Sequence, residues 1–159
     1  VHPGLGESEK RAVSIGGGLT HRLNLSDGYL IKDNHVKSVE KELGISRYRA
    51  LGIAIERVMK HRAGGNRKLF VEVEVWNLAE ALLAARKDVN AILIDNRKPN
   101  EIKEIVTEVR KANSKVIIEA SGGIKSKNIA KFLATGVDFV SMSELTLASK
   151  PVDISLELV

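Results

Sequence analysis

The chain has 159 residues, of which 43% are apolar and 28% are charged, and this composition suits one soluble globular domain. The sequence contains no cysteine, which excludes disulfides and thiolate metal sites. No apolar run reaches the length that spans a membrane, and no signal-peptide pattern opens the chain. We therefore expect a cytoplasmic protein with no membrane partner.

The net charge of +5 comes with an aromatic content of only 4%, which argues against a surface that stacks nucleic-acid bases. Lysine and arginine are scattered among aspartate and glutamate instead of forming a basic run. This pattern favours a site for small acidic ligands over a nucleic-acid partner.

The first 65 residues show no regular repeat. Their opening lacks a start methionine and is interpreted as a cut end. Three helical stretches are predicted at 7–15, 36–43 and 45–62, and a short apolar run covers 29–32. A glycine-containing break is expected at 63–66.

From residue 69 onward, β-branched runs alternate with helical stretches about every 22 to 25 residues. Strands are predicted at 69–75, 91–95, 116–120 and 138–142, and helices at 77–87, 99–112 and 126–135. A complete eight-fold β/α barrel needs roughly 200 residues or more. The expected fold is therefore α/β, with about five parallel strands in a partial TIM-like barrel or an open sheet.

Polar side chains end several of the predicted strands. Because parallel strands share one C-terminal edge, we expect Lys32, Glu74, Asp95 and Ser121 to face a common cleft. This edge is the predicted functional site.

A glycine cluster at 16–18 precedes His21 and Arg22, and Lys32 follows ten residues later. Backbone N–H groups near glycines and these cations can bind a carboxylate or a phosphate. The alternative is a helix stop beside solvated cations. Lys32 ends an apolar run, so an anionic partner is expected for it.

Two carboxylates, Glu74 and Asp95, follow neighbouring predicted strands. Glu72 shares a strand face with Glu74, because side chains alternate in a strand, and the valines between them should face the helices. Inward carboxylates can hold ribose hydroxyls or a divalent cation. The alternative is a buried ion pair with Lys32.

The segment Ser121-Gly122-Gly123 leads toward a predicted helix. Successive N–H groups at a helix start form a phosphate nest, although a simple βα turn also needs glycine. A metal role for His21 and His35 is disfavoured, because no third histidine or HxxxH pair supports it.

Taken together, these stretches resemble the quinolinate phosphoribosyltransferases, also called nicotinate-nucleotide pyrophosphorylases (carboxylating). The matching segments are 3–5, 9–10, 16–18, 21–22, 30–35, 72–75, 93–96, 119–124, 135–138 and 153–156. The resemblance implies coupling of quinolinate to phosphoribosyl pyrophosphate with Mg²⁺, and release of CO₂ and pyrophosphate to give nicotinate mononucleotide for NAD biosynthesis.

The resemblance also implies roles for individual residues. His21, Arg22 and Lys32 would hold the quinolinate carboxylates, and Glu74 and Asp95 would bind the ribose hydroxyls with the metal nearby. The 5′-phosphate would be bound by Ser121, Gly122 and Gly123, and Ser143 would lie beside it. The catalytic group would be Lys32, Glu74 and Asp95.

This sequence departs from the family pattern in several places. Glycine is usual at Ser143 and histidine at Leu147, and the family's substrate-binding Thr-Arg-Lys segment and N-terminal domain are missing. We expect residues 1–159 to be the C-terminal barrel domain of an enzyme that forms a homodimer or higher homo-oligomer, and to be inactive alone. The alternatives are a paralogous transferase with another anionic acceptor and a non-catalytic phosphoribosyl-binding module.

Overall fold

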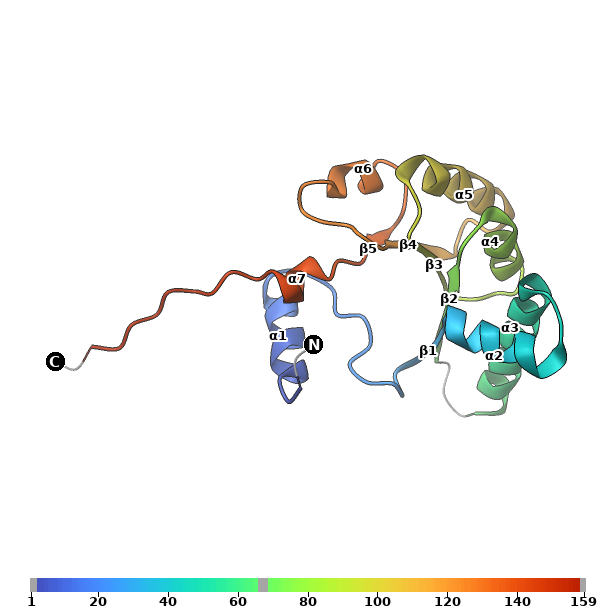
Figure 1. Ribbon diagram of the computed structural model, residues 1–159, viewed down its shortest axis with the longest axis horizontal. Helices are drawn as coiled ribbons and strands as arrows, with labels where there is room; N and C mark the ends of the chain where they lie inside the picture. The colour runs from blue at the N-terminus through green and yellow to red at the C-terminus, as the bar shows by residue number, and fades with distance from the viewer. Residues whose placement is uncertain (1–2, 66–68, 158–159) are drawn as a thin grey trace.

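The computed structural model describes residues 3–65 and 69–157, and its centre is a curved sheet of five parallel strands (Figure 1). The strands lie in the order β1-β2-β3-β4-β5, which is also their order along the chain. They are β1 (Gly28–Ile31), β2 (Phe70–Val75), β3 (Ala91–Asp95), β4 (Ile117–Ser121) and β5 (Phe139–Val140). The prediction of a partial parallel barrel is confirmed.

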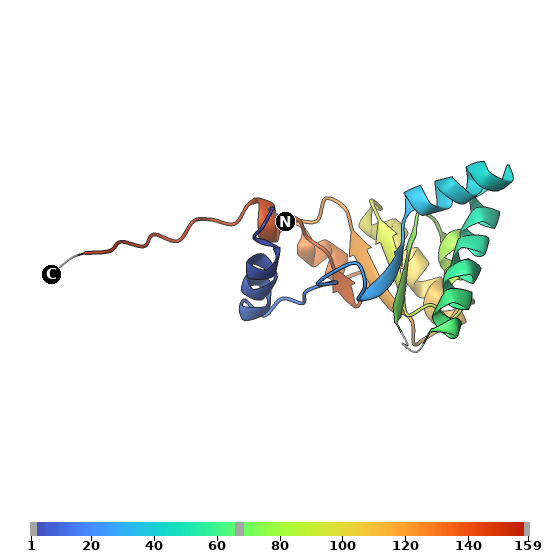
Figure 2. The same cartoon turned by 90° about the horizontal axis from the view of Figure 1, so that it is seen from below.

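Helices connect the strands and cover the outer, convex face of the sheet (Figures 1 and 2). They are α1 (Gly6–Ile15), α2 (Asp33–Leu43), α3 (Arg47–Gly64), α4 (Leu78–Ala85), α5 (Pro99–Ala112), α6 (Ile129–Leu133) and α7 (Glu144–Leu147). Helices α1 and α7 lie apart from this layer, toward the open side of the arc, and the C-terminal segment extends away from the body (Figure 1). Among the described residues, no helix combines the length and apolar character that crossing a bilayer requires.

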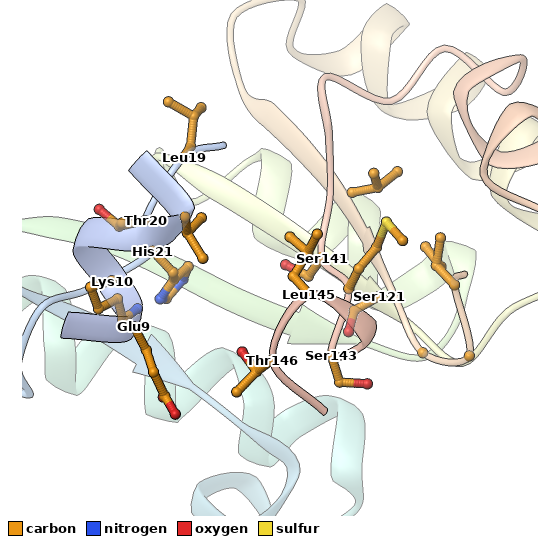
Figure 3. A pocket seen from close by; sticks show the side chains of 16 residues that line it. Glu9, Lys10, Leu19, Thr20, His21, Ser121, Ser141, Ser143, Leu145 and Thr146 are labelled. Carbon is orange, nitrogen blue, oxygen red and sulfur yellow. The ribbon is translucent and has the colours of Figure 1, made fainter. Parts of the chain in front are cut away.

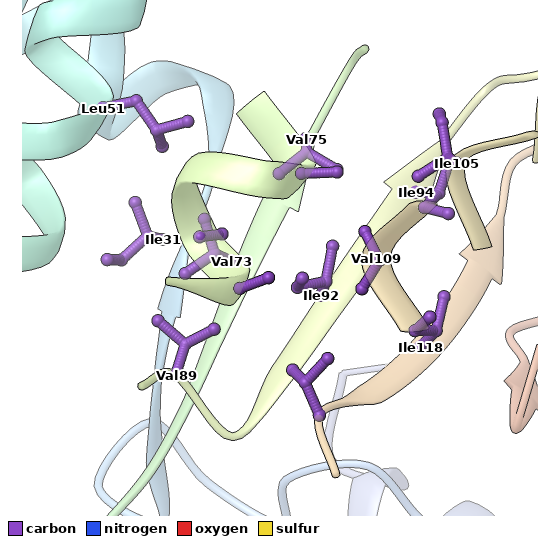
Figure 4. Packing of buried hydrophobic residues seen from close by; sticks show 14 of the residues in the cluster. Ile31, Leu51, Val73, Val75, Val89, Ile92, Ile94, Ile105, Val109 and Ile118 are labelled. Carbon is purple, nitrogen blue, oxygen red and sulfur yellow. The ribbon is translucent and has the colours of Figure 1, made fainter. Parts of the chain in front are cut away.

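The core lies between the sheet and the outer helices (Figure 4). Val71, Val73 and Val75 are fully buried on the outer face of β2, as their alternation with glutamates predicts. Ile92 and Ile118 occupy the same layer on the next strands. Each such side chain contributes about 1.5–3 kcal/mol by leaving water, so this layer fixes the strand positions and thereby the inward-facing residues.

The N-terminal turns of two helices follow local capping chemistry. Asn77 accepts a hydrogen bond from the Glu80 N–H at 2.9 Å at the start of α4. Pro99 occupies the first position of α5, whose bounds match the predicted 99–112, and the Glu101 carboxylate accepts from the Lys98 N–H at 2.9 Å.

Several predicted bounds require correction. The helix predicted at 126–135 covers only Ile129–Leu133, because Asn128 accepts a hydrogen bond from the Lys125 N–H at 2.7 Å and holds a turn before it. The last strand is reduced from 138–142 to two residues, and α7 was not predicted. The helix predicted from residue 36 begins at Asp33, and the predicted break at 63–66 lies partly outside the described residues.

Candidate functional site

Three hollows lie along the C-terminal edge and inner face of the sheet. The carboxylate hollow, of about 480 Å³, is lined by Lys32, Asp33, Glu74, Trp76, Asp95, Asn96 and Arg97. The serine-glycine hollow, of about 410 Å³, is lined by residues that include Ser121, Gly122, Gly123, Ser143 and His21. The inner hollow, of about 660 Å³, lies against the inner sheet face and includes His21, Arg22, Glu72 and Glu119.

Glu74 and Asp95 project from the same face of the sheet. The β2–β3 register pairs Glu74 with Leu93, and Asp95 lies two residues farther along β3, so both carboxylates reach the carboxylate hollow. The expectation that Lys32, Glu74, Asp95 and Ser121 share one cleft is therefore correct only for the first three. Ser121 faces the neighbouring serine-glycine hollow instead.

The two carboxylates have different surroundings. Burial, and to a smaller degree the nearby charge of Asp95, raises the pKa of Glu74 above its ordinary value, while a hydrogen bond from Trp76 opposes this effect. The Trp76 indole Nε1 donates to Glu74 Oε1 at 3.4 Å. The Asn96 amide donates to Asp95 Oδ2 at 2.6 Å and orients that carboxylate.

Lys32 lies at the mouth of the carboxylate hollow, where it is exposed. It precedes the first turn of α2, and its backbone N–H donates to His35 Nδ1 at 3.0 Å. The alternative of a buried ion pair between Lys32 and the glutamates is not found among the described residues. Glu72 pairs with His21 instead. The Lys32 ammonium group remains available to a ligand.

The carboxylate hollow fits a hard cation only in part. Carboxylate and amide oxygens are suitable Mg²⁺ ligands, and Glu74, Asp95 and Asn96 supply them at one edge. Within residues 3–65 and 69–157, however, no three His, Asp or Glu side chains gather closely enough to hold a metal ion. Mg²⁺ commonly binds through one or two carboxylates plus substrate phosphates, and these residues fit that arrangement.

Figure 3 shows the serine-glycine hollow, where Ser121 and Ser143 approach each other from β4 and from the residue before α7. The prediction that Ser121–Gly123 lies at the start of a helix is wrong, because α6 begins only at Ile129. The glycine loop instead lies opposite Ser143. Leu147 is 76% exposed and does not line this hollow.

Gly122 and Gly123 both have positive φ angles, of 95° and 65°. A Cβ atom on Gly122 would lie 2.3 Å from the Asn96 side-chain oxygen and 2.8 Å from the Asn96 backbone nitrogen. A Cβ atom on Gly123 would meet nothing within 4 Å. Gly122 is therefore needed for close packing of the β3 and β4 loops, whereas Gly123 borders open space.

His21 and Arg22 enter the inner hollow from the segment between α1 and β1. His21 Nε2 lies 2.5 Å from Glu72 Oε2, and the Arg22 guanidinium donates to the Gly28 carbonyl at 3.0 Å. His21 also lines the serine-glycine hollow, whereas Arg22 lines only the inner one. The glycine cluster at 16–18 adjoins this segment, but only Gly18 lines the inner hollow.

Sequence reasoning gave no site role to five residues that lie in these hollows: Trp76, Asn96, Arg97, Glu119 and Ser141. Trp76 and Arg97 come one and two residues after strands β2 and β3. The same strand-end rule that selected Asp95 would have found them.

The family model for "Quinolinate phosphoribosyl transferase, C-terminal domain" matches residues 1–157. The chain belongs to this family. It is 43% identical over 161 residues to a probable nicotinate-nucleotide pyrophosphorylase [carboxylating] of Methanocaldococcus jannaschii, covering 99% of this chain and 52% of the relative. A relative of the same name from Methanothermobacter thermautotrophicus is 40% identical over 158 residues, covering 98% of this chain and 52% of the relative.

A solved structure shows the same arrangement. The crystal structure of NadC from Streptococcus pyogenes superposes with a TM-score of 0.79 at 35% identity, covering 99% of this chain and 50% of that one. This quinolinate phosphoribosyl transferase domain thus spans about half the length of the curated relatives that it matches.

Proposed function

We propose that this chain carries the catalytic site for phosphoribosyl transfer from phosphoribosyl pyrophosphate to quinolinate, with decarboxylation to nicotinate mononucleotide in NAD biosynthesis. The observation that carries the proposal is the placement of Glu74, Asp95 and the Ser121–Gly123 loop along one edge of a barrel of this family. Names of the relatives support the activity.

The carboxylate hollow suits the ribose. Carboxylates beside the anomeric carbon stabilise positive charge as the pyrophosphate leaves, and they can accept hydrogen bonds from the ribose hydroxyls. Glu74 and Asp95 are assigned these roles. Mg²⁺, when bound, would neutralise the pyrophosphate, and Lys32 and Arg97 add positive charge at the same hollow.

The other two hollows suit the remaining groups. The loop Ser121–Gly123 and the Ser143 hydroxyl would hold the 5′-phosphate. His21 and Arg22 would hold the carboxylates of quinolinate, because a dianion needs clustered cations. Lys32, which was expected to join them, lines the carboxylate hollow and not the inner one. We further propose a cytoplasmic enzyme that acts as a homodimer or higher homo-oligomer.

Paired substitutions test the assignment of ligands to hollows. They use the completed protein, meaning this chain joined to the part of the Methanocaldococcus jannaschii relative that lies outside the matched region. Ser121→Ala removes a hydroxyl group that lines the serine-glycine hollow and should weaken phosphoribosyl pyrophosphate more than quinolinate. Arg22→Ala should do the reverse. Each lost charge-assisted contact costs about 1.5–3 kcal/mol, which raises Kd tenfold or more. Titration calorimetry measures the Kd of each ligand.

Gly122 is unsuitable for this comparison, because any side chain there collides with Asn96. Thermal unfolding of both variants supplies the control for folding. Equal losses for both ligands in folded variants would contradict the assignment.

A further inference from the structure

A buried carboxylate pairs with the histidine that borders two of the hollows. The Glu72 side chain is 3% exposed, and its Oε2 lies 2.5 Å from Nε2 of His21, whose side chain is 40% exposed. One edge of the imidazole therefore contacts a buried carboxylate, while the ring also borders the serine-glycine hollow (Figure 3).

Besides His21, the Glu72 carboxylate interacts with the Glu119 carboxyl group of β4 but with no other cation that the structure shows within the described part of the chain. Its second oxygen, Oε1, is buried and has no hydrogen-bond partner there. An ionised carboxylate in such a place is costly unless a cation compensates it. His21 is the cation that the geometry supplies.

A second carboxyl group lies on the same inner face. Glu119 on β4 accepts a hydrogen bond from the Ser141 hydroxyl, and burial followed by the charge of Glu72 raises its pKa. The charges that act on His21 come from β2 (Glu72), from β4 (Glu119) and from its own segment (Arg22), while Glu9 and Lys10 of α1 line the same hollow.

The balance of these groups favours the imidazolium form. The hydrogen bond to Glu72 raises the pKa of His21, burial opposes it, and the charges of Glu72 and Glu119 raise it further against a smaller effect of Arg22. His21 thus keeps its proton at a higher pH than an ordinary histidine.

We propose that Glu72 is a positioning residue that holds His21 as a cation facing the inner hollow, so that His21 binds a carboxylate of the acidic acceptor. The inference rests on the proposed function for the identity of that acceptor. Glu72 also lines the inner hollow, but as an anion it would repel the carboxylates of the acceptor, so its proposed role is to act through His21. Binding of the acceptor should accordingly weaken as pH rises through the His21 pKa.

Histidine side-chain NMR tests the proposal on this chain and does not require catalytic turnover. Titration of the imidazole resonances gives the His21 pKa in the unsubstituted chain, assigned with His21→Gln. Glu72→Gln keeps the side-chain shape and should lower that pKa by about one unit or more, a tenfold loss of proton affinity. Glu119→Gln should lower it less, because its influence is purely through charge.

A matched control is available on the exposed surface of α5. Glu104→Gln removes the charge of an exposed carboxylate there and should leave the titration of His21 unchanged. Backbone amide spectra establish that each variant is folded. A His21 pKa at or below the ordinary value of about 6.5, or one unaffected by Glu72→Gln in a folded chain, would overturn the proposal.

Quinolinate is then titrated into the completed protein and its Glu72→Gln variant at two pH values. At a pH above both His21 pKa values the Kd should rise about tenfold for each unit by which the substitution lowers that pKa, and the difference should shrink at a pH below both. Equal weakening at both pH values would overturn the proposal in favour of a structural role. If quinolinate does not bind the folded, completed protein at either pH, the proposed function fails, while the pKa measurements still decide the role of Glu72.

Discussion

Glu74→Gln in the completed protein is expected to lower kcat by about 10²- to 10³-fold, the usual loss when one preorganised electrostatic group is removed. Asp95→Asn should have an effect of similar size. Both residues line the carboxylate hollow, where positive charge would develop on the ribose. Steady-state assays give kcat and KM, and Glu104→Gln on the exposed surface of α5 is the matched control.

The temperature of unfolding distinguishes a loss of kcat from a folding defect. Because the pKa of Glu74 is raised in the folded state, its contribution to stability is fully present below the unfolded pKa and is lost as pH rises through the folded pKa. Glu74→Gln should therefore unfold at the same or a higher temperature at pH 7. A variant that keeps kcat within threefold of the unsubstituted enzyme would contradict the role of Glu74.

Arg47→Ala is expected to lower the free energy of unfolding by about 3–5 kcal/mol, because it leaves a buried carboxylate without its cation. The Arg47 Nε donates to Glu80 Oε1 at 2.9 Å, and the two side chains are 17% and 3% exposed. Its guanidinium carbon also lies 3.5 Å from the centre of the Trp76 ring. The Trp76 backbone N–H donates to the same carboxylate at 2.9 Å.

The matched control is Arg57→Ala, which removes an exposed ion pair with Glu42 at 2.7 Å, both side chains being 50% exposed. That change should leave the midpoint of urea unfolding nearly unchanged, because solvent screens an exposed ion pair. Urea unfolding followed by circular dichroism gives both values, and Trp76, the single tryptophan of the sequence, reports locally by fluorescence. Equal losses in the two variants would show that the Arg47 cluster does not stabilise this edge of the barrel.

The sequence predicted the parts of the fold that depend on local pattern. Alternating valines and glutamates in β2 set the outer and inner faces, and Pro99 marked the start of α5. The end of the chain was less predictable, because β5 has only two residues and α7 only four. Such short elements carry too few residues for a period to show.

The candidate site was predicted where a strand end determines position, as for Glu74 and Asp95. It was missed where contacts come from distant segments. The pairing of His21 with Glu72 joins residues 51 apart in sequence, and no spacing rule connects them. The collision of any Gly122 side chain with Asn96 likewise depends on how two loops pack.

The most direct test of the proposed function is a product assay with quinolinate, phosphoribosyl pyrophosphate and Mg²⁺. The completed protein should form nicotinate mononucleotide, pyrophosphate and CO₂ in equal amounts, while residues 1–159 alone should show no detectable turnover. The reason is that residues 1–159 span only about half the length of the curated relatives, and the resemblance implies that further substrate-binding cations lie outside them. A folded, completed protein that binds both substrates but forms no nicotinate mononucleotide would contradict the proposed activity.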